Sequence, residues 1–598
     1  MLGEAAENVS WIKKKFDTIS DLRDRFETDF GFIRSEQFTI PKKEGKWDSF
    51  TTNRPSTDAN KIINVLASAK VKISIPLTDE DKQQRVDLST TERFVYGCIS
   101  LRDNLMSGIP EALPLQSGLS WHAPIRGWIG LLCYFYEKDD GKNGKVCPHI
   151  AVWDILNTAW ASGYNGLVKA GNMRYASPEE IKDQYKEDLK PDNYGRVVIY
   201  DIWDKDEHGV IGTDGANSKS NGYLLKPEKH GLDHVPALIL PGGSTPLVQS
   251  KDYTDTIKNV GESVFVNNRN LFEAESRMGT YLMTFAGRAA KTPMAHEWDS
   301  TKGGNFPALE GNPFEKGSEI PIDIGKGEKM TPLIPPELTR DFFSFQQYLL
   351  GRLEVGGQAP VSFGQISQAL PAAGINILRH ASMENIKPPQ KLMERAYQWL
   401  AHELVSQYKN GKFGKMEIQG IDGSNRKFRM EVEPENIDDS WQFETELITD
   451  FPQDDMANVG MSVQLKQAKL LSDQTIRDKY LNVADTDSEE RKLDNQAANE
   501  VAFIKLRHLA VALLKDGDIE GAQFIMDDIE RMKMEASQPQ QGVPSAPTSG
   551  IAAQPNIPQA VAPSADTTAV APPPPAAATQ PTPNQGRFRR FISRFGGG

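Results

Sequence analysis

The sequence predicts an α+β fold that ends in a disordered tail, and three observations lead to this class. Residues 38–250 alternate short strand-like runs with helical segments and turns. From residue 251 onwards, long proline-poor stretches with helical spacing dominate. Residues 537–585 are rich in Pro, Ala, Gln and Thr, so they cannot bury enough apolar surface to offset the entropy of ordering.

The composition narrows the class of protein. The chain has 598 residues, of which 38% are hydrophobic, and this length suggests three or four domains. Its longest apolar run, residues 127–136, is shorter than the about 20 residues that span a bilayer. The N-terminal segment carries too many charges for a signal peptide. We therefore expect no membrane association.

Charge and cysteine content exclude further classes. The formal net charge is −13, and phosphate neutralisation needs a basic face, so broad nucleic-acid binding is not expected. Cys98, Cys133 and Cys147 show no metal-type spacing. This pattern suits a reducing compartment and predicts no disulfide framework.

The first 26 residues predict an amphipathic helix. Its apolar residues recur every three or four positions, and they are Val9, Ile12, Phe16, Ile19, Leu22 and Phe26. A helix of this kind most often docks on its own domain. Binding to a partner or to a membrane is the alternative.

Several short elements are predicted before residue 250. Residues 57–76 favour a helix that runs into a strand, and residues 195–212 alternate as a hairpin does. Further strands are expected at residues 162–177, 221–227 and 235–241.

Two long helices flank a compact insert in the middle of the chain. Residues 251–291 contain no proline, and as one helix they would span roughly 60 Å. Their apolar stripe comprises Val260, Val264, Leu271, Met278 and Leu282. The insert, residues 292–336, is dense in Gly and Pro, and its last twenty residues favour two short strands around a turn. Residues 337–356 predict the second helix.

The segments that follow alternate between helices and a hairpin. Residues 357–374 are a loop, and residues 375–411 are a helix that Pro388 and Pro389 should kink near Ile386. Residues 415–434 predict a β-hairpin, and residues 437–536 are expected to be helical. In the latter stretch, Ser472 should cap one helix, and the spacing of Thr486 and Glu489 is that of a capping box.

No catalytic constellation is present in the sequence. We find no phosphate-binding loop, nucleophile elbow or H-E-x-x-H helix. His230 and His234 have i,i+4 spacing, but glycine and proline around them favour ordinary loop histidines over a metal site. We therefore expect no enzyme activity, no cofactor and no metal.

The order of these elements resembles that of the portal proteins of tailed bacteriophages, over roughly residues 40–530. Two segments add to the resemblance, namely "VGGQAPVSFGQISQALPAAGINILRHASMENIKPP" and "QLKQAKLLSDQTIRDKYLNVADTDSEERKL". The resemblance implies a ring subunit with a helical stem, a small α/β clip, an α/β wing, a helical crown and a disordered C-terminal tail.

The resemblance also implies a division of the chain into portal regions. Residues 1–250 would be the N-terminal wing region, 251–291 the first stem helix, 292–336 the clip, 337–356 the second stem helix, 357–374 the tunnel loop, 375–436 the kinked wing helix and hairpin, 437–536 the crown region, and 537–598 the tail with a basic tip.

The function implied by the resemblance is that of a portal. Such a protein forms a ring, twelve subunits in this family, at one capsid vertex, where DNA passes during packaging and ejection. The implied partners are terminase, the tail adaptor or head-completion protein, the major capsid and scaffold proteins, and double-stranded DNA in the channel. The implied location is the virion, with the host cytoplasm during assembly.

Candidate contact residues follow from this resemblance and from the residue types. The uncharged tunnel-loop residues Gln365, Ile366, Ser367 and Gln368 could meet DNA without holding it, although a plain surface loop is the alternative. In the clip, Trp298 and Phe306 could anchor a partner, or both could pack inside the clip.

The C-terminal tip combines basic and aromatic residues, namely Arg587, Phe588, Arg589, Arg590, Phe591 and Arg594. A helix would gather its apolar groups on one face, which favours a groove on a scaffold or coat protein. Binding of the arginines to DNA phosphates and a disordered solubilising end are the alternatives.

Two other functions compete with the portal. The first is a non-channel virion scaffold or binding protein built as a helical bundle. The second is an enzyme, such as a hydrolase that uses the Gly-rich insert. Rings with a central hole would distinguish the portal from both.

Overall fold

A computed structural model describes most of the chain up to residue 537. The described residues are 2–36, 49–76, 85–110, 112–138, 145–213, 221–243, 253–290, 294–297, 329–332, 340–357, 384–411, 413–423, 425–449, 462–479, 493, 496, 502–516 and 519–537. Contacts divide the chain into two compact units, Met1–Gln496 and Ala497–Gly598. The predicted tail beyond residue 537 lies outside the described residues.

The N-terminal segment forms two helices, α1 (Ala5–Thr18) and α2 (Ser20–Ile33), which meet at Ile19. All six of the predicted apolar residues are buried. Those of α1 pack against Tyr200, Ile202 and Ile211 of a β-sheet, and Leu22 and Phe26 of α2 join a second cluster. The predicted docking on the chain's own domain is therefore confirmed, whereas the single predicted helix is wrong, because the chain breaks at Ile19.

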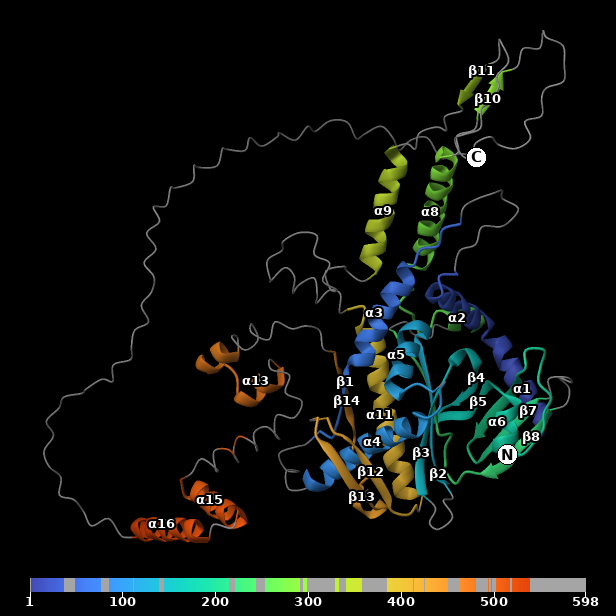
Figure 1. The fold of residues 1–598 in the computed structure, drawn as a ribbon. Helices are drawn as coiled ribbons and strands as arrows, with labels where there is room; N and C mark the ends of the chain where they lie inside the picture. Colours follow the sequence, from blue (N-terminus) through green and yellow to red (C-terminus); the bar gives the residue numbers. More distant parts are fainter. Residues whose placement is uncertain are drawn as a thin grey trace, which may run out of the picture. The chain divides into compact units, whose positions relative to one another are not determined.

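Two antiparallel sheets occupy the N-terminal half of the first unit (Figure 1). The three-stranded sheet has the order β3-β2-β9 and comprises β2 (Trp128–Lys138), β3 (Lys145–Trp153) and β9 (Ala237–Pro241). The five-stranded sheet runs in sequence order and comprises β4 (Thr158–Gly163), β5 (Gly166–Ala176), β6 (Val197–Asp204), β7 (Glu207–Thr213) and β8 (Asn221–Lys229). The predicted hairpin and the three predicted strand segments are thus confirmed.

The largest core lies between the three-stranded sheet and helices. It joins β2 and β3 to α3 (Arg54–Ser68), α4 (Arg85–Met106), α5 (Leu115–Arg126) and α11 (Lys387–Asn410). Short elements complete the first unit, namely α6 (Pro178–Tyr185) and the 3-10 helices Ile155–Asn157 and Pro434–Asn436. Sheets and helices therefore share the cores, which is the predicted α+β class.

Two smaller sheets extend this core. The predicted hairpin at 415–434 is confirmed as β12 (Met416–Ile421) and β13 (Lys427–Val432), whose turn is closed by a hydrogen bond from Asn425 N to Asp422 O at 2.9 Å. β1 (Lys70–Ser74), which follows α3 as predicted, pairs with β14 (Glu444–Ile448). The prediction that residues 437–536 are all helical is wrong at β14, because Leu447 is buried and its strand adds to an edge formed far earlier in the chain.

The predicted single helix over residues 251–291 is also wrong. The chain forms α7 (Tyr253–Lys258), turns over residues 259–268, and then forms α8 (Arg269–Ala290). Gly261 lies within the break, where its φ is +72° and a Cβ atom would lie 2.1 Å from Nε1 of Trp128. Only a glycine with left-handed backbone allows this close approach.

The second predicted helix is present as α9 (Arg340–Gly356). In the insert between α8 and α9, β10 (Met294–Glu297) pairs with β11 (Lys329–Pro332). The two strands therefore join the two ends of the insert, whereas the sequence placed both strands in its last twenty residues. The remaining insert lies outside the described residues.

The predicted kink near Ile386 takes a different form. α11 begins at Lys387, with Pro388 and Pro389 in its first turn. Proline is tolerated there because the first N–H groups of a helix have no intrahelical acceptor. In the described residues, the two prolines therefore lie at the start of a helix and do not kink its interior. Residues 375–383, the first part of the predicted helix, lie outside the described residues.

Three further helices follow. Ser472 caps α13 (Asp473–Lys479), as predicted, by accepting a hydrogen bond from Thr475 N at 3.2 Å. Thr486 and Glu489 lie outside the described residues. In the second unit, α15 (Ala502–Asp516) and α16 (Ile519–Ser537) bury Ala510, Ala522 and Ile529. Within the described residues, no helix has the length and apolar character of a membrane span.

Candidate functional site

The two helices that flank the insert form an antiparallel pair, here called the two-helix arm (α8 and α9; Figure 1). Asn268, directly before α8, donates its side-chain Nδ2 to the carbonyl oxygen of Leu353 near the end of α9, at 2.9 Å. Phe272 and Met278 of α8 share an apolar cluster with Leu349 and Leu353 of α9. The start of α8 and the end of α9 therefore form the base of the arm.

A buried ion pair fixes the base of the arm to the N-terminal helices. Nε and Nη2 of Arg269 donate to the two carboxylate oxygens of Asp29, each at 2.9 Å. Ser263 Oγ donates to the same carboxylate at 2.7 Å. Asp29 is fully buried on α2, so the first residue of α8 has a strong, oriented contact with the body.

Arg25, one turn earlier on α2, fixes the turn between α7 and α8. Its guanidinium donates to the carbonyl oxygens of Lys258, Val260 (3.2 Å) and Gly261 (2.7 Å), and to that of Arg126 (3.3 Å). Burial lowers the pKa of Arg25 to about 10, which still leaves the group charged at neutral pH. The carbonyls of the turn are therefore held by one side chain.

A second buried arginine joins α5 to the sheet beneath the arm. Arg126 donates to the two carboxylate oxygens of Asp154 at 3.0 and 2.7 Å, and to the carbonyl of Phe26 at 2.9 Å. Burial acts to raise the pKa of Asp154, but Arg126 and the other donors around it lower that pKa overall. Arg126 therefore joins α5 to α2, the helix that carries Asp29, and to the segment after β3.

A hydrogen bond joins the end of α9 to the segment directly before α11. Asn385 donates its side-chain Nδ2 to the carbonyl oxygen of Gly357 at 2.9 Å. Residues 358–383, which include most of the predicted tunnel loop, lie between these two positions in the sequence and outside the described residues.

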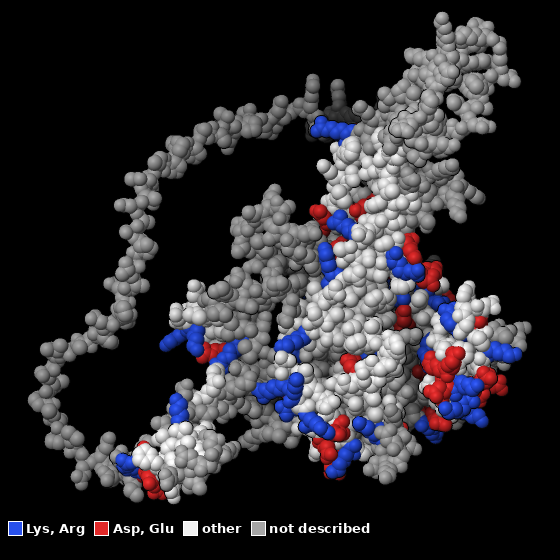
Figure 2. Space-filling view, viewed as in Figure 1, with Lys and Arg blue, Asp and Glu red and all other residues white. Residues whose placement is uncertain are grey.

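Both helices of the arm carry exposed apolar side chains. In α9, Phe345, Tyr348 and Val355 expose 50%, 57% and 80% of their surface, and Tyr281 and Met283 of α8 are also exposed. Figure 2 shows few charged side chains over the described part of the arm, whereas charges of both signs gather over the body. Contiguous apolar surface of this kind is common at interaction sites, whereas single exposed apolar residues are ordinary.

All of the contact residues predicted from the sequence lie outside the described residues. This holds for the tunnel-loop residues Gln365, Ile366, Ser367 and Gln368, the clip residues Trp298 and Phe306, and the tip residues Arg587, Phe588, Arg589, Arg590, Phe591 and Arg594. Their roles therefore stay predictions.

The residues that hold the arm were not singled out from the sequence. One signal was available, because Asp29 follows Leu22 and Phe26 at helical spacing and so lies on the apolar stripe of its helix. A carboxylate on a buried face needs a partner. The identity of that partner, Arg269, depends on the tertiary fold.

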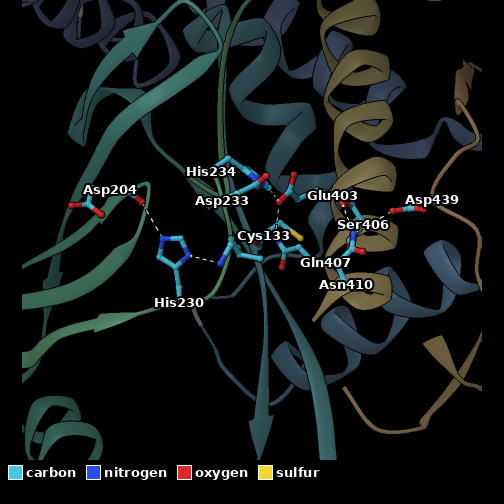
Figure 3. A network of polar contacts seen from close by, with 11 residues as sticks. Cys133, Asp204, His230, Asp233, His234, Glu403, Ser406, Gln407, Asn410 and Asp439 are labelled. Carbon is cyan, nitrogen blue, oxygen red and sulfur yellow. Dashed lines mark hydrogen bonds and ion pairs between the residues drawn. The ribbon is translucent and has the colours of Figure 1, made fainter. Parts of the chain in front are cut away.

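The His230–His234 motif belongs to a polar network rather than to one convergent site (Figure 3). His234 Nε2 lies 2.7 Å from Oε1 of Glu403, a buried residue of α11, which also accepts a hydrogen bond from Gln407 at 2.6 Å. His230 instead contacts the carbonyl oxygen of Asp204 at 3.1 Å. The network ties the segment between β8 and β9 to α11.

Acidic, histidine and cysteine side chains are the other groups that could take part in chemistry. Across the described ranges, no group of three or more His, Cys, Asp or Glu side chains could hold a metal ion. The three cysteines are buried, and burial raises the pKa of Cys98 and Cys133. A buried protonated thiol is a poor nucleophile.

Comparison with known proteins gives weak likenesses only. No protein-family model matches the chain, and no curated protein matches it. Among solved structures, a chain of "Neck of native GTA particle computed with C12 symmetry" is 10% identical with a TM-score of 0.34, covering 71% of this chain and 88% of that chain. A chain of "Neck of empty GTA particle computed with C6 symmetry" is 10% identical with a TM-score of 0.35, covering 71% and 89%. At these scores, neither likeness supports a conclusion about this chain.

Proposed function

We propose that this chain is a portal protein, the ring-forming subunit of a head-to-tail connector in a tailed phage-like particle. The observation that carries the proposal is the two-helix arm. Its helices flank an insert, as the stem helices of portal proteins flank the clip, and α9 exposes the apolar side chains of Phe345, Tyr348 and Val355.

A ring gives these apolar side chains a partner. When helices stand side by side around a channel, each helix buries one stripe against its neighbour and leaves another face to the channel. The exposed Phe345, Tyr348 and Val355 of α9 suit the buried stripe, because aromatic and aliphatic side chains dominate the energetics of subunit contacts.

The mounting of the arm also suits a channel through which DNA is driven. Asp29 holds the first residue of α8, and Arg25 holds the turn before it, through buried, charge-assisted hydrogen bonds. Such contacts resist displacement of the arm relative to the body. The net charge of −13 also lowers affinity for phosphates, which favours sliding of a duplex over retention.

The remaining roles of the proposal come from the family resemblance. The clip would bind terminase and the tail adaptor, the tunnel loop would line the DNA channel, and the C-terminal tip would contact capsid or scaffold protein. The ring would occupy one vertex of the virion after assembly in the host cytoplasm. The motor ATPase would be the terminase, so this chain would have no enzymatic role.

The alternative is a virion scaffold or binding protein built as a helical bundle without a channel. The described first unit has two antiparallel sheets in its cores, which a helical bundle does not explain. The arm alone would fit either function, so assembly is the discriminating property.

Electron micrographs of the purified full-length protein test the proposal. We expect rings with a central hole, with a mass by light scattering that is a multiple of the 66.4 kDa subunit. Compact or irregular particles without a hole, at concentrations where the protein is folded, would contradict the portal function.

A further inference from the structure

A cavity of about 140 Å³ lies at the base of the arm, where α9 ends and α11 begins. The turn between α7 and α8, one face of α3, Pro124 of α5 and Phe272 of α8 also line it. The volume is about ten times what a single water molecule needs. The cavity can therefore hold a group of several non-hydrogen atoms.

The polar groups in this cavity are mainly hydrogen-bond acceptors. Asp58, Glu262 and Glu384 supply three carboxylates to its lining. Asn268 also lines it, is only 2% exposed, and has a side-chain Oδ1 without a hydrogen-bond partner. A buried amide oxygen that lacks a donor costs free energy until a ligand or water supplies one.

These acceptors gather at the C-terminal end of a helix. A Cβ atom built on Gly357 would lie 3.3 Å from Nδ2 of Asn268 and 3.4 Å from Oδ2 of Asp58. Both side chains therefore face the end of α9, where the last carbonyl groups carry partial negative charge. The helix end adds to the negative potential of the carboxylates.

Two of the side-chain amide donors in the same place already have acceptors. The Nδ2 groups of Asn268 and Asn385 are bound to the carbonyl oxygens of Leu353 and Gly357. Pro388 and Pro389 open α11 at the cavity wall without N–H groups. No Lys or Arg is among the described residues of the lining. Nearby, Nε of Arg54 and Nζ of Lys61 lie 3.9 and 3.8 Å from the carboxylate oxygens of Asp58. Lys387 forms an ion pair with Glu384.

We propose that this cavity binds a cationic nitrogen group, either an alkylammonium or a guanidinium. Such a group donates hydrogen bonds in several directions, so it can satisfy Asn268 Oδ1 and the carboxylate of Asp58 together. Its charge is favoured by the carboxylates and by the C-terminal end of α9. Its carbon atoms would contact the apolar part of the lining, which includes Ile62 and Phe272.

Two sources could supply this cation. One is a small free diamine or guanidinium compound, and the other is a lysine or arginine side chain of a second copy of this chain. The chemistry at the cavity is the same for both, so binding is tested first and the source second.

Calorimetric titration of the full-length protein with 1,4-diaminobutane and with methylguanidinium tests the binding. We expect saturable binding of one ligand per chain, beyond the heat produced by NaCl of matched ionic strength. Asp58→Asn should weaken binding about tenfold, because a hydrogen bond to a charged group is lost. Glu384→Gln should weaken it about two- to fivefold, because Glu384 is exposed at the mouth of the cavity.

The matched control is Glu273→Gln, which removes one negative charge from an exposed site on α8 that does not line the cavity. It should bind both ligands as the wild type does. Since Glu384 is exposed, its variant keeps the test valid if Asp58→Asn fails to fold. Absence of saturable binding, or equal affinity in the two cavity variants and the control, would overturn the proposal.

A second measurement separates the two sources once binding is established. A saturating diamine should slow self-association if a side chain of a second copy normally fills the cavity. If self-association is unchanged, acid extraction of the purified protein should release a small amine. Binding of the probes does not require ring formation, so the result is independent of the portal function.

Discussion

Arg269, the first residue of α8, forms a bidentate ion pair with Asp29, a fully buried residue of α2. Ser263 Oγ donates a third hydrogen bond to the same carboxylate at 2.7 Å. Two segments that are distant in the sequence, the N-terminal helices and the arm, are thus joined at one buried charge.

Removal of this charge should destabilise the protein strongly. Asp29→Asn keeps the shape of the side chain but leaves Arg269 without its countercharge, and breaking a buried ion pair costs roughly 3–5 kcal/mol. We expect the free energy of unfolding, measured with denaturant, to fall by that order. Glu27→Gln is the control, because Glu27 lies on the exposed side of the same helix. Equal stability of the two variants would show that the pair does not hold the arm.

The position at which α8 begins can be tested with proline. Arg277→Pro falls inside the helix at an exposed site, where proline removes a hydrogen bond and clashes with the preceding turn, at a cost of about 3 kcal/mol or more. Asn270→Pro falls in the first turn, where proline is tolerated. Denaturant unfolding curves should therefore show a lower free energy of unfolding for Arg277→Pro than for Asn270→Pro.

The proline result also distinguishes the observed break from the single helix expected from the sequence. In one helix that spans residues 251–291, both substitutions would be internal and similarly damaging. A large loss of stability in Asn270→Pro would thus contradict a helix that starts at Arg269. Arg277→Ala controls for loss of the Arg277 side chain.

The contact between His234 and Glu403 predicts a pH dependence. The hydrogen bond to Glu403 raises the pKa of His234 to about 9 in the folded protein, from an ordinary value of 6.5. Because the folded-state pKa is the higher one, this contact contributes fully below pH 6.5. Its contribution is lost as the pH rises through about 9.

His234→Gln measures this contribution directly. The stability difference between wild type and variant should be largest near pH 6 and should shrink towards pH 10. His230→Gln is the contrast, because burial lowers the pKa of His230, so its imidazole is already neutral above pH 6.5. A difference for His234→Gln that stays constant across this range would exclude a charged His234–Glu403 pair.

Elements with a strong local pattern could be predicted from the sequence. The hairpin of β6 and β7 and that of β12 and β13 follow from alternation around short turns. The N-terminal helices follow from three- and four-residue spacing, and the cap at Ser472 follows from its residue type. In each case the signal lies within a few residues.

Features set by distant contacts could not be predicted. Gly261 lies within the break, where Trp128, on another element, occupies the space that a Cβ atom would fill. β14 is a strand because β1 offers it an edge, and its five residues carry little pattern of their own. The candidate site behaves likewise, since the partners of Asp29, Asn268 and Asn385 are decided by the fold.

The exposed aromatic side chains of α9 provide a test of whether subunits associate through the arm. Phe345 and Tyr348 are half exposed or more, and their rings lie 6.5 Å apart between centroids. The double substitution Phe345→Ser and Tyr348→Ser should leave the subunit folded, because neither ring is buried within it. Truncation of aromatic anchors at an interface costs more than about 1 kcal/mol each. The concentration needed for self-association should therefore rise about tenfold or more, as measured by sedimentation velocity.

The matched control for this variant is the double substitution Tyr164→Ser and Tyr194→Ser, which removes two exposed aromatic rings away from the arm. It should associate as the wild type does, and micrographs of it should show the same particles. If both double variants associate alike, the arm does not form the subunit contact. If only the arm variant fails while its unfolding midpoint is unchanged, the apolar face of α9 joins one subunit to the next, because loss of folding is excluded as the cause.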